Sequence, residues 1–121
     1  MLTNSNTKRA AAIASLTIAL AAGASLTAAA QDEPSIKRGQ EVYTAQKCSM
    51  CHAISGKGSK KSPLDGVGTK LSAEEIREWI VNPVEMTKKT NSTKKPPMPN
   101  KFSKLPKEDI DALVAYMQSL K

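Results

Sequence analysis

The sequence is poor in large flat side chains, with one Trp, two Tyr and one Phe among 121 residues. It also contains a single His and only two Cys. The single His excludes any metal site that needs two imidazoles from one chain. Since small domains bury a small fraction of their surface, so few aromatics cannot build a generous core. The composition therefore leaves room for a bulky apolar ligand in the interior.

Long apolar runs are missing except at the start of the chain. Lys8 and Arg9 precede an uncharged run, rich in Ala, that ends at residues 28–30 with three alanines. This pattern is typical of a cleaved export signal. It predicts a signal peptide over residues 1–30, a mature domain over 31–121 and a periplasmic location. An uncleaved membrane anchor is the alternative, because the run is long enough to span a bilayer, although weakly apolar.

Three segments of the mature chain have helical patterns. The first covers residues 32–46, with acids at its start and Pro34 in its first turn. The second covers 72–81, where Ser72 and Glu75 form a capping-box pattern. The third runs from Pro106 to the end, with acids early and one apolar face. The sequence therefore predicts a single all-α domain with no internal repeats.

Two long segments lack a helical or strand period. Residues 53–70 are rich in Gly, Ser, Lys and Pro, and we expect them to form a loop. Residues 83–105 carry four prolines and six lysines. We also expect this segment to lack regular structure, and a structureless segment of this length is usually functional. No strand is predicted in either segment.

The chemistry of the chain is concentrated at residues 48–52, which read Cys-Ser-Met-Cys-His. C-x-x-C-H is the attachment signature for c-type haem. Thiols three residues apart can reach the two vinyl groups of one porphyrin, while the adjacent imidazole lies beneath the iron. The motif predicts one haem, bound covalently through Cys48 and Cys51 and ligated through its iron by His52.

Other sites can contain C-x-x-C. A thioredoxin-like dithiol accompanies a strand-helix-strand pattern, which is missing here. A structural zinc site needs four ligands, and these three residues leave it one short unless a carboxylate joins. A disulfide between residues three apart would constrain very little of the chain.

A second axial ligand must come from elsewhere, and Met is the natural choice. Met98 lies in Pro-Pro-Met-Pro at residues 96–99, where the prolines restrict the backbone around the thioether. We therefore favour Met98 over Met86. The alternative is that Met98 only fills a gap in the core.

The whole mature chain resembles the small class I cytochromes c. Besides the motif, Gly39 and Tyr43 with Ala115–Tyr116 look like the family's crossing of the first and last helices, where the Gly admits an aromatic ring. A tolerated surface Gly is the alternative for Gly39. The resemblance implies an all-α class I cytochrome c fold, with three main helices wrapped around one covalently attached haem.

The resemblance also implies roles for single residues. Pro63 looks like the family proline whose carbonyl accepts a hydrogen bond from the ligand imidazole. Trp79 resembles the aromatic residue that packs near a haem propionate, although a plain core position is the alternative. Met98 matches the axial Met in the loop before the last helix.

These features predict an electron carrier that catalyses no reaction. The alternative is a haem-containing ligand sensor, or a subunit of a larger redox enzyme, with a displaceable sixth ligand. Residues 1–30 hold two basic residues and no acid, so the mature chain carries a net charge of +5. Lysines near the motif and around Met98 predict an acidic-faced redox donor and acceptor, and a solvated charge run is the alternative. We expect a monomer that does not bind nucleic acid and meets membranes only through partner complexes.

Overall fold

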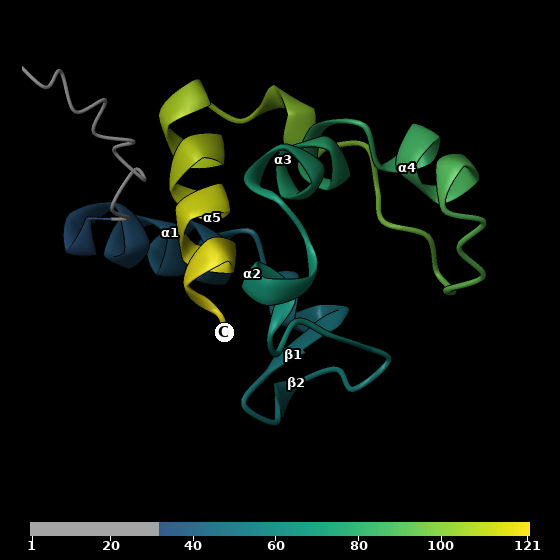
Figure 1. The fold of residues 1–121 in the computed structure, drawn as a ribbon, viewed down its shortest axis with the longest axis horizontal. Coiled ribbons are helices and arrows are strands. Elements are labelled where there is room, and N and C mark those ends of the chain that lie inside the picture. Colours follow the sequence, from purple (N-terminus) through teal and green to yellow (C-terminus); the bar gives the residue numbers. More distant parts are fainter. Residues whose placement is uncertain (1–31) are drawn as a thin grey trace, which may run out of the picture.

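The computed structural model describes residues 32–121, so the predicted export signal lies outside the described residues. The elements in chain order are α1 (Glu33–Ala45), η1 (Cys48–Met50), β1 (His52–Ile54), β2 (Lys57–Gly58), β3 (Ser62–Pro63), α2 (Val67–Lys70), α3 (Ala73–Val81), α4 (Pro83–Lys89), η2 (Phe102–Lys104) and α5 (Lys107–Ser119). The fold is mostly helical, which confirms the predicted all-α class (Figure 1). Within residues 32–121 no helix has the length and apolar character that crossing a bilayer requires.

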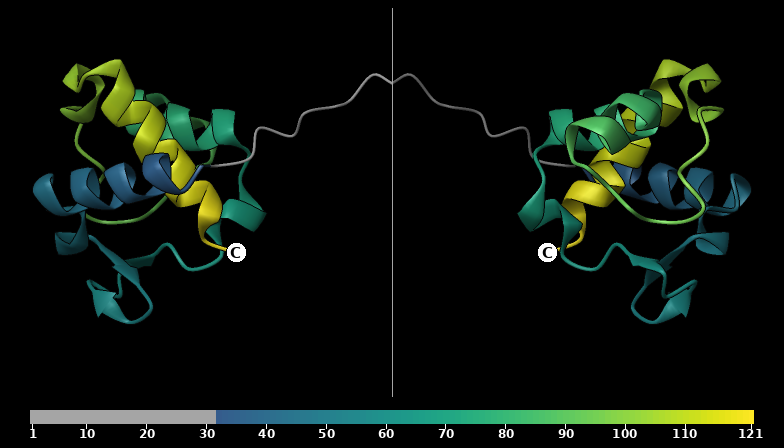
Figure 2. Two further views of the ribbon diagram at one scale, coloured as in Figure 1. Left: turned by 90° about the vertical axis from the view of Figure 1, so that its left-hand side faces the viewer. Right: turned by 90° about the vertical axis from the view of Figure 1, so that its right-hand side faces the viewer.

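The first and last helices, α1 and α5, cross one another in close contact (Figure 2). Gly39 is buried at the crossing, where a Cβ atom would lie 2.2 Å from the carbonyl oxygen of Ala112 and 2.6 Å from Cβ of Tyr116. No larger residue fits there without separating the helices. The predicted crossing is therefore confirmed, and Gly39 is not a surface glycine.

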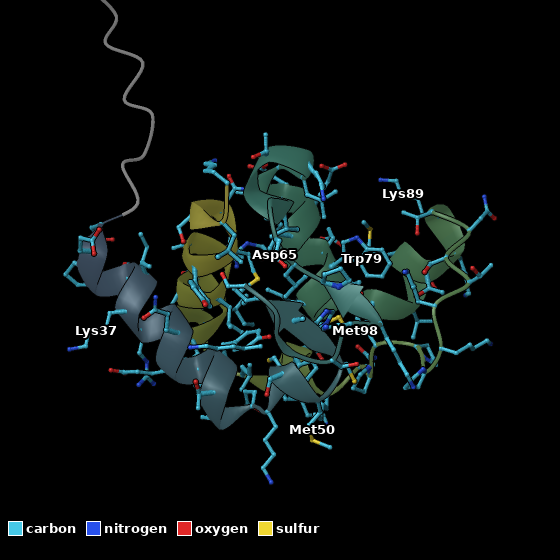
Figure 3. All side chains as sticks on the ribbon, turned by 90° about the horizontal axis from the view of Figure 1, so that it is seen from below. Lys37, Met50, Asp65, Trp79, Lys89 and Met98 are labelled. Atoms are coloured by element: carbon cyan, nitrogen blue, oxygen red, sulfur yellow. The ribbon has the colours of Figure 1, made fainter. Side chains whose placement is uncertain are left out.

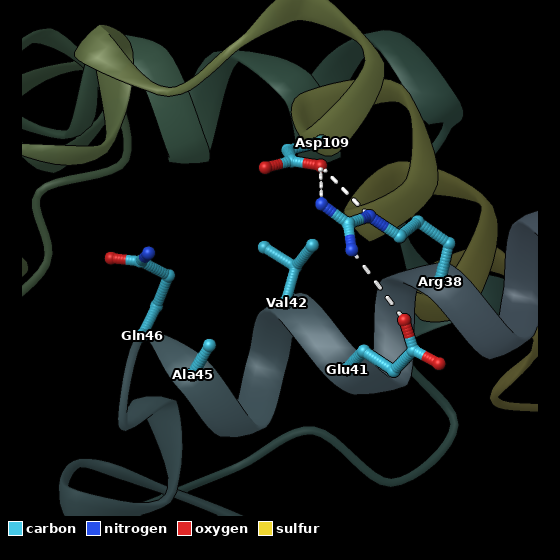
Figure 4. Close-up of a pocket in the computed structure, with 6 residues that line it drawn as sticks. All are labelled: Arg38, Glu41, Val42, Ala45, Gln46 and Asp109. Carbon is cyan, nitrogen blue, oxygen red and sulfur yellow. Dashed lines mark hydrogen bonds and ion pairs between the residues drawn. The ribbon is translucent and has the colours of Figure 1, made fainter.

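Charged side chains hold α5 to both neighbouring helices. Arg38 of α1 donates from Nη2 and Nε to Oδ1 of Asp109, at 2.7 and 3.0 Å (Figure 4). Asp111 accepts from Lys107 and from Arg77 of α3, and these two hydrogen bonds lower the pKa of its carboxyl group. These pairs are partly exposed, so solvent screens them and each contributes little to stability. Their main effect is on the orientation of α5, and their effect on the stability of the fold is small.

The predicted start of α3 is confirmed. Ser72 Oγ accepts from the backbone N–H of Glu75 at 3.1 Å, and the Glu75 carboxylate accepts from the N–H of Ser72 at 2.8 Å. This capping box satisfies two backbone donors that the first turn leaves free. The main core combines α1, α3, η2 and α5, and its buried members are Val42, Tyr43, Ile76, Ile80, Phe102, Ile110, Leu113, Val114 and Met117.

The prediction that residues 53–70 form a loop was wrong. A small sheet with the strand order β2-β1-β3 occupies most of this segment, and α2 follows it. β1 pairs antiparallel with β2 and parallel with β3. Each strand has only two or three residues, which is too short to produce a readable period of two.

The prediction that residues 83–105 lack regular structure was also wrong. Pro83 ends α3 as expected, but it is also the first residue of α4. Proline suits that position because the first helical N–H needs no partner and the φ angle is already helical. Glu85 in the first turn and Lys88 and Lys89 in the last turn complement the helix dipole. In Figure 1, α4 and the segment after it extend to one side of the α1–α5 pair.

Candidate functional site

The C-x-x-C-H segment lies in a tight turn directly after α1. Lys47 has a left-handed backbone with φ of 56°, which reverses the chain at the end of the helix. The turn η1 follows, with Met50 N–H donating to Lys47 O and Cys51 N–H to Cys48 O, both at 3.1 Å. The two cysteines are therefore presented from a single short turn.

The two thiols face different surroundings. Cys48 is half-buried and packs against the main core, whereas Cys51 is exposed. Burial raises the pKa of the Cys48 thiol. Both cysteines are free, and no three His, Cys, Asp or Glu side chains of residues 32–121 group in a way that could hold a bare metal ion. The turn therefore offers one inward and one outward thiol for covalent attachment.

The ring of His52, at the start of β1, is oriented by a backbone carbonyl. Its Nδ1 lies 2.9 Å from the carbonyl oxygen of Ser62. A carbonyl can only accept, so Nδ1 must carry the proton that it donates. In the neutral ring this leaves the lone pair on Nε2, which is the atom free to bind a metal.

The expectation that the carbonyl of Pro63 accepts this bond was wrong, because Ser62 supplies it. The parallel pairing of β1 with β3 places His52 opposite Ser62 and Ala53 opposite Pro63. The register therefore moves the acceptor one residue earlier than the family pattern suggested. The physical role expected of the bond, which orients the imidazole, is the same.

Tyr43 links the helix crossing to the same histidine. It is buried in α1, and its hydroxyl donates to the backbone carbonyl of His52 at 3.4 Å. Its ring meets that of Tyr116 edge-on, with centroids 5.9 Å apart. Burial raises the pKa of Tyr43 to about 12, so the hydroxyl remains a donor.

The four methionines of the described chain differ in their surroundings. Met50 is 74% exposed, while Met86 and Met117 are 6% and 7% exposed. Met98 is half-buried, packs against the main core and borders a groove of about 570 Å³. The groove lies between α4 and residues 97–100. Met98 therefore combines contact with the core and access to open space.

Trp79 belongs to α3 but lies outside the main core cluster. It is partly exposed, so the plain core alternative does not describe it. In Figure 3, Trp79 and Met98 lie between the α1–α5 pair and α4. The indole is therefore available to a ligand on that side of the molecule.

Comparison with known families agrees with this geometry. The sequence model of the family described as Cytochrome c matches residues 36–121. The chain belongs to the cytochrome c family. Comparisons with curated proteins and with solved structures give no significant match. The matched residues include the attachment turn, the sheet and every helix from α3 to α5.

This cytochrome binds haem c covalently, with iron at its centre, and its residues fit that group. Cys48 and Cys51 are two unpaired thiols at the C-x-x-C spacing. His52 has its Nδ1 engaged by Ser62, which leaves Nε2 available to an iron. Proteins of this family are typically electron carriers, and the bound group supplies the one-electron redox chemistry.

Two of the groups that hold His52 were missed in the sequence. The Ser62 carbonyl could not be found, because every residue has a carbonyl and only the strand register selects this one. Tyr43 was identified as a helix-crossing residue, but its hydrogen bond to His52 was not. Tyr43 lies nine residues before His52, and no sequence pattern indicates a contact at that separation. The reversal of the chain at Lys47 brings the two residues together.

Proposed function

We propose that this cytochrome c is a periplasmic electron carrier that transfers one electron at a time through a single haem ligated by His52 and Met98. The observation that carries the proposal is the hydrogen bond from His52 Nδ1 to Ser62 O. It fixes the tautomer and direction of the ring within the attachment turn. One C-x-x-C-H motif and one His in the sequence support a single haem.

Met98 is proposed as the sixth ligand because of its surroundings. Met50 is directed into solvent, and Met117 is enclosed in the main core. Met86 is buried on α4, with 6% of its surface exposed. Met98 lies between two prolines that hold its backbone with little entropy left to lose. With both axial positions filled, no coordination site is open for substrate, which supports a carrier and not an enzyme.

Exposed lysines support acidic redox partners. Lys94 Nζ donates to the carbonyl of Lys61 at 3.2 Å, so the loop after β2 and the loop before Met98 meet. The exposed lysines near the motif and around Met98 are Lys57, Lys60, Lys61, Lys88, Lys89, Lys94, Lys95, Lys101 and Lys104. Among them, Lys88 pairs with Glu85, and no acid occurs in residues 86–107. An excess of exposed positive charge attracts and orients an acidic partner.

The proposal is tested by expressing the full chain in a bacterium that attaches c-type haem. We expect the periplasmic fraction to contain a protein with a reduced-minus-oxidised haem spectrum. Its denatured mass should equal residues 31–121 plus one haem. A mass that retains residues 1–30 would contradict cleavage of the signal. A mass with no haem would contradict the proposed function.

The carrier and the sensor differ in how the iron responds to external ligands. An iron with both axial positions filled should bind carbon monoxide or cyanide weakly or slowly. Rapid and tight binding by the purified protein would instead support a ligand sensor with a displaceable sixth ligand. Met98 is half-buried and borders an open groove, so ligand binding is the measurement that distinguishes the carrier from the sensor.

A further inference from the structure

Gly58, in β2, is pressed against the backbone of the attachment turn. Its φ angle is +105°, and a Cβ atom built on it would lie 2.2 Å from the carbonyl oxygen of His52 and 2.9 Å from that of Ser49. Real Cβ atoms do not approach backbone oxygens so closely. Any side chain at this position would therefore displace His52, Ser49 or the strand itself.

A neighbouring hydrogen bond holds the same two segments together. The backbone N–H of Ser59 donates to the carbonyl of Ser49 at 2.9 Å. Gly58 also pairs with Ala53, the residue after His52. The β2 backbone thus contacts the C-x-x-C-H segment both between its cysteines and at its histidine.

We propose that Gly58 is a positioning residue for the haem site, which sets the distance between the cysteine turn and the imidazole of His52. The inference rests on the proposed haem ligation and deepens it. Each thiol adds across one vinyl group, its sulfur bonding to one carbon and its hydrogen passing to the other, so attachment is redox-neutral overall. Both additions and the iron–imidazole bond must fit one rigid macrocycle. An error in the spacing of Ser49 and His52 therefore affects all three bonds.

The chain contains a control for backbone strain in the same hairpin. Gly56 also has a positive φ, of +76°, but nothing lies within 4 Å of a Cβ atom built there. Gly56→Ala therefore introduces a strained left-handed alanine without pushing on the attachment turn. Any difference between Gly56→Ala and Gly58→Ala reports the contact with Ser49 and His52.

A second control accounts for loss of stability. At Gly39 a Cβ atom would lie 2.2 Å from a carbonyl oxygen, as at Gly58, but that oxygen belongs to Ala112 in α5. Gly39→Ala therefore introduces a matched clash at the helix crossing, away from the cysteines. A general failure to fold should affect Gly39→Ala and Gly58→Ala alike.

The experiment expresses the wild type and the three variants as full chains with the haem attachment machinery. The first measurement is the fraction of chains that carry covalent haem, from the denatured mass. We expect Gly58→Ala to lower this fraction about tenfold, the lower end of what losing an outer-shell partner costs a metal site. Gly56→Ala should load like the wild type, and Gly39→Ala should lose less than Gly58→Ala.

The second measurement is made on the protein that carries haem, and it reports the coordination of the iron. The reduction potential and the paramagnetically shifted ring protons of His52 report the axial bond, and overall stability alone does not move them. We expect both to change in Gly58→Ala and to remain at wild-type values in Gly56→Ala. Gly39→Ala, whose clash reaches His52 only through Tyr116 and Tyr43, should change them less than Gly58→Ala does.

The outcomes separate this inference from the proposed function. If the wild type carries no haem, the proposed function fails. If the wild type is loaded but Gly58→Ala matches either control in both loading and the His52 signals, only the role of Gly58 is overturned. An equal loss of loading in Gly58→Ala and Gly39→Ala counts as such a match.

Discussion

The hydroxyl of Tyr43 donates to the carbonyl oxygen of His52 across 3.4 Å. The same side chain packs edge-on against Tyr116 of α5. One residue therefore connects the crossing of the first and last helices to the backbone of His52, the proposed iron ligand. The helix crossing and the haem site are mechanically joined, so a change in one is expected to be detectable in the other.

Replacing Tyr43 with Phe tests this connection. The ring contact with Tyr116 is kept, while the hydrogen bond to His52 is lost. Because that bond is long, we expect the free energy of unfolding to fall by about 1 kcal/mol. Denaturant unfolding of the haem-loaded protein measures the change, and Tyr116→Phe, which keeps the donor on Tyr43, is the control. Equal losses in the two variants would count against a specific role for the Tyr43 hydroxyl.

The raised pKa of Tyr43 predicts that the stability of the fold depends on pH under alkaline conditions. Burial raises the pKa of Tyr43 from 10.0 to about 12. Between these values the unfolded chain releases a proton that the folded chain retains. The contribution to stability is fully present below about pH 10 and is lost as the pH rises through the folded pKa. The wild type should therefore lose stability more steeply than Tyr43→Phe over this range, and parallel curves would refute the prediction.

Removing the thiols should prevent stable folding. We expect either Cys48→Ser or Cys51→Ser to weaken the haem linkage. The double variant should be unfolded, because the mature chain has four aromatics and cannot bury enough apolar surface alone. Far-ultraviolet circular dichroism and denatured mass measure both effects. A haem-free double variant that unfolds cooperatively would show that the core is sufficient without the ligand.

Electron exchange with an acidic partner should depend on salt and on the exposed lysines around Met98. Charges are screened beyond about 10 Å at 0.1 M salt, so the association rate should fall as ionic strength rises. Lys95→Glu should slow association at low salt more than Lys37→Glu, which makes the same charge change on α1. Stopped-flow kinetics measure the rates. Equal rates for the two variants would place the docking surface elsewhere.

Met98→Ala should change the coordination and the reduction potential of the iron, whereas Met86→Ala should mainly lower the stability of the fold. A thioether favours Fe(II), so we expect its loss from Met98 to lower the reduction potential and admit cyanide. The weak sulfur-to-iron charge-transfer band of the oxidised protein should also disappear. Met86 is buried on α4, and its loss should cost about 2 kcal/mol or more of stability while the band remains. The reverse pattern would assign the ligand to Met86.

The features predicted from sequence are those whose physical cause is local. The capping box at Ser72 and Glu75 needs only the side chains of one helical turn, and the structure forms it as expected. The crossing at Gly39 could be predicted because a mid-helix glycine is costly unless another backbone lies close. The C-x-x-C-H spacing likewise carries its chemistry within five residues.

The features that were missed depend on pairing between segments. A two-residue strand such as β3 has no pattern of its own and exists only because β1 lies beside it. The acceptor for His52 follows from that pairing, which is why Ser62 and not Pro63 provides it. For Pro83, only the tendency of proline to end a helix was considered. The proline does stop α3, but it also starts α4.

The crossing of α1 and α5 is also a long-range contact that folding must form. Arg38 and Asp109, which meet at the crossing, are separated by 71 positions in the chain. Bringing such distant segments together has an entropic cost that grows with the length of the intervening chain. A haem attached at residues 48–52 shortens that loop only if a second segment also binds it, as proposed for Met98. Ligation from both segments would then divide the intervening chain into shorter loops and lower the entropic cost of docking α5.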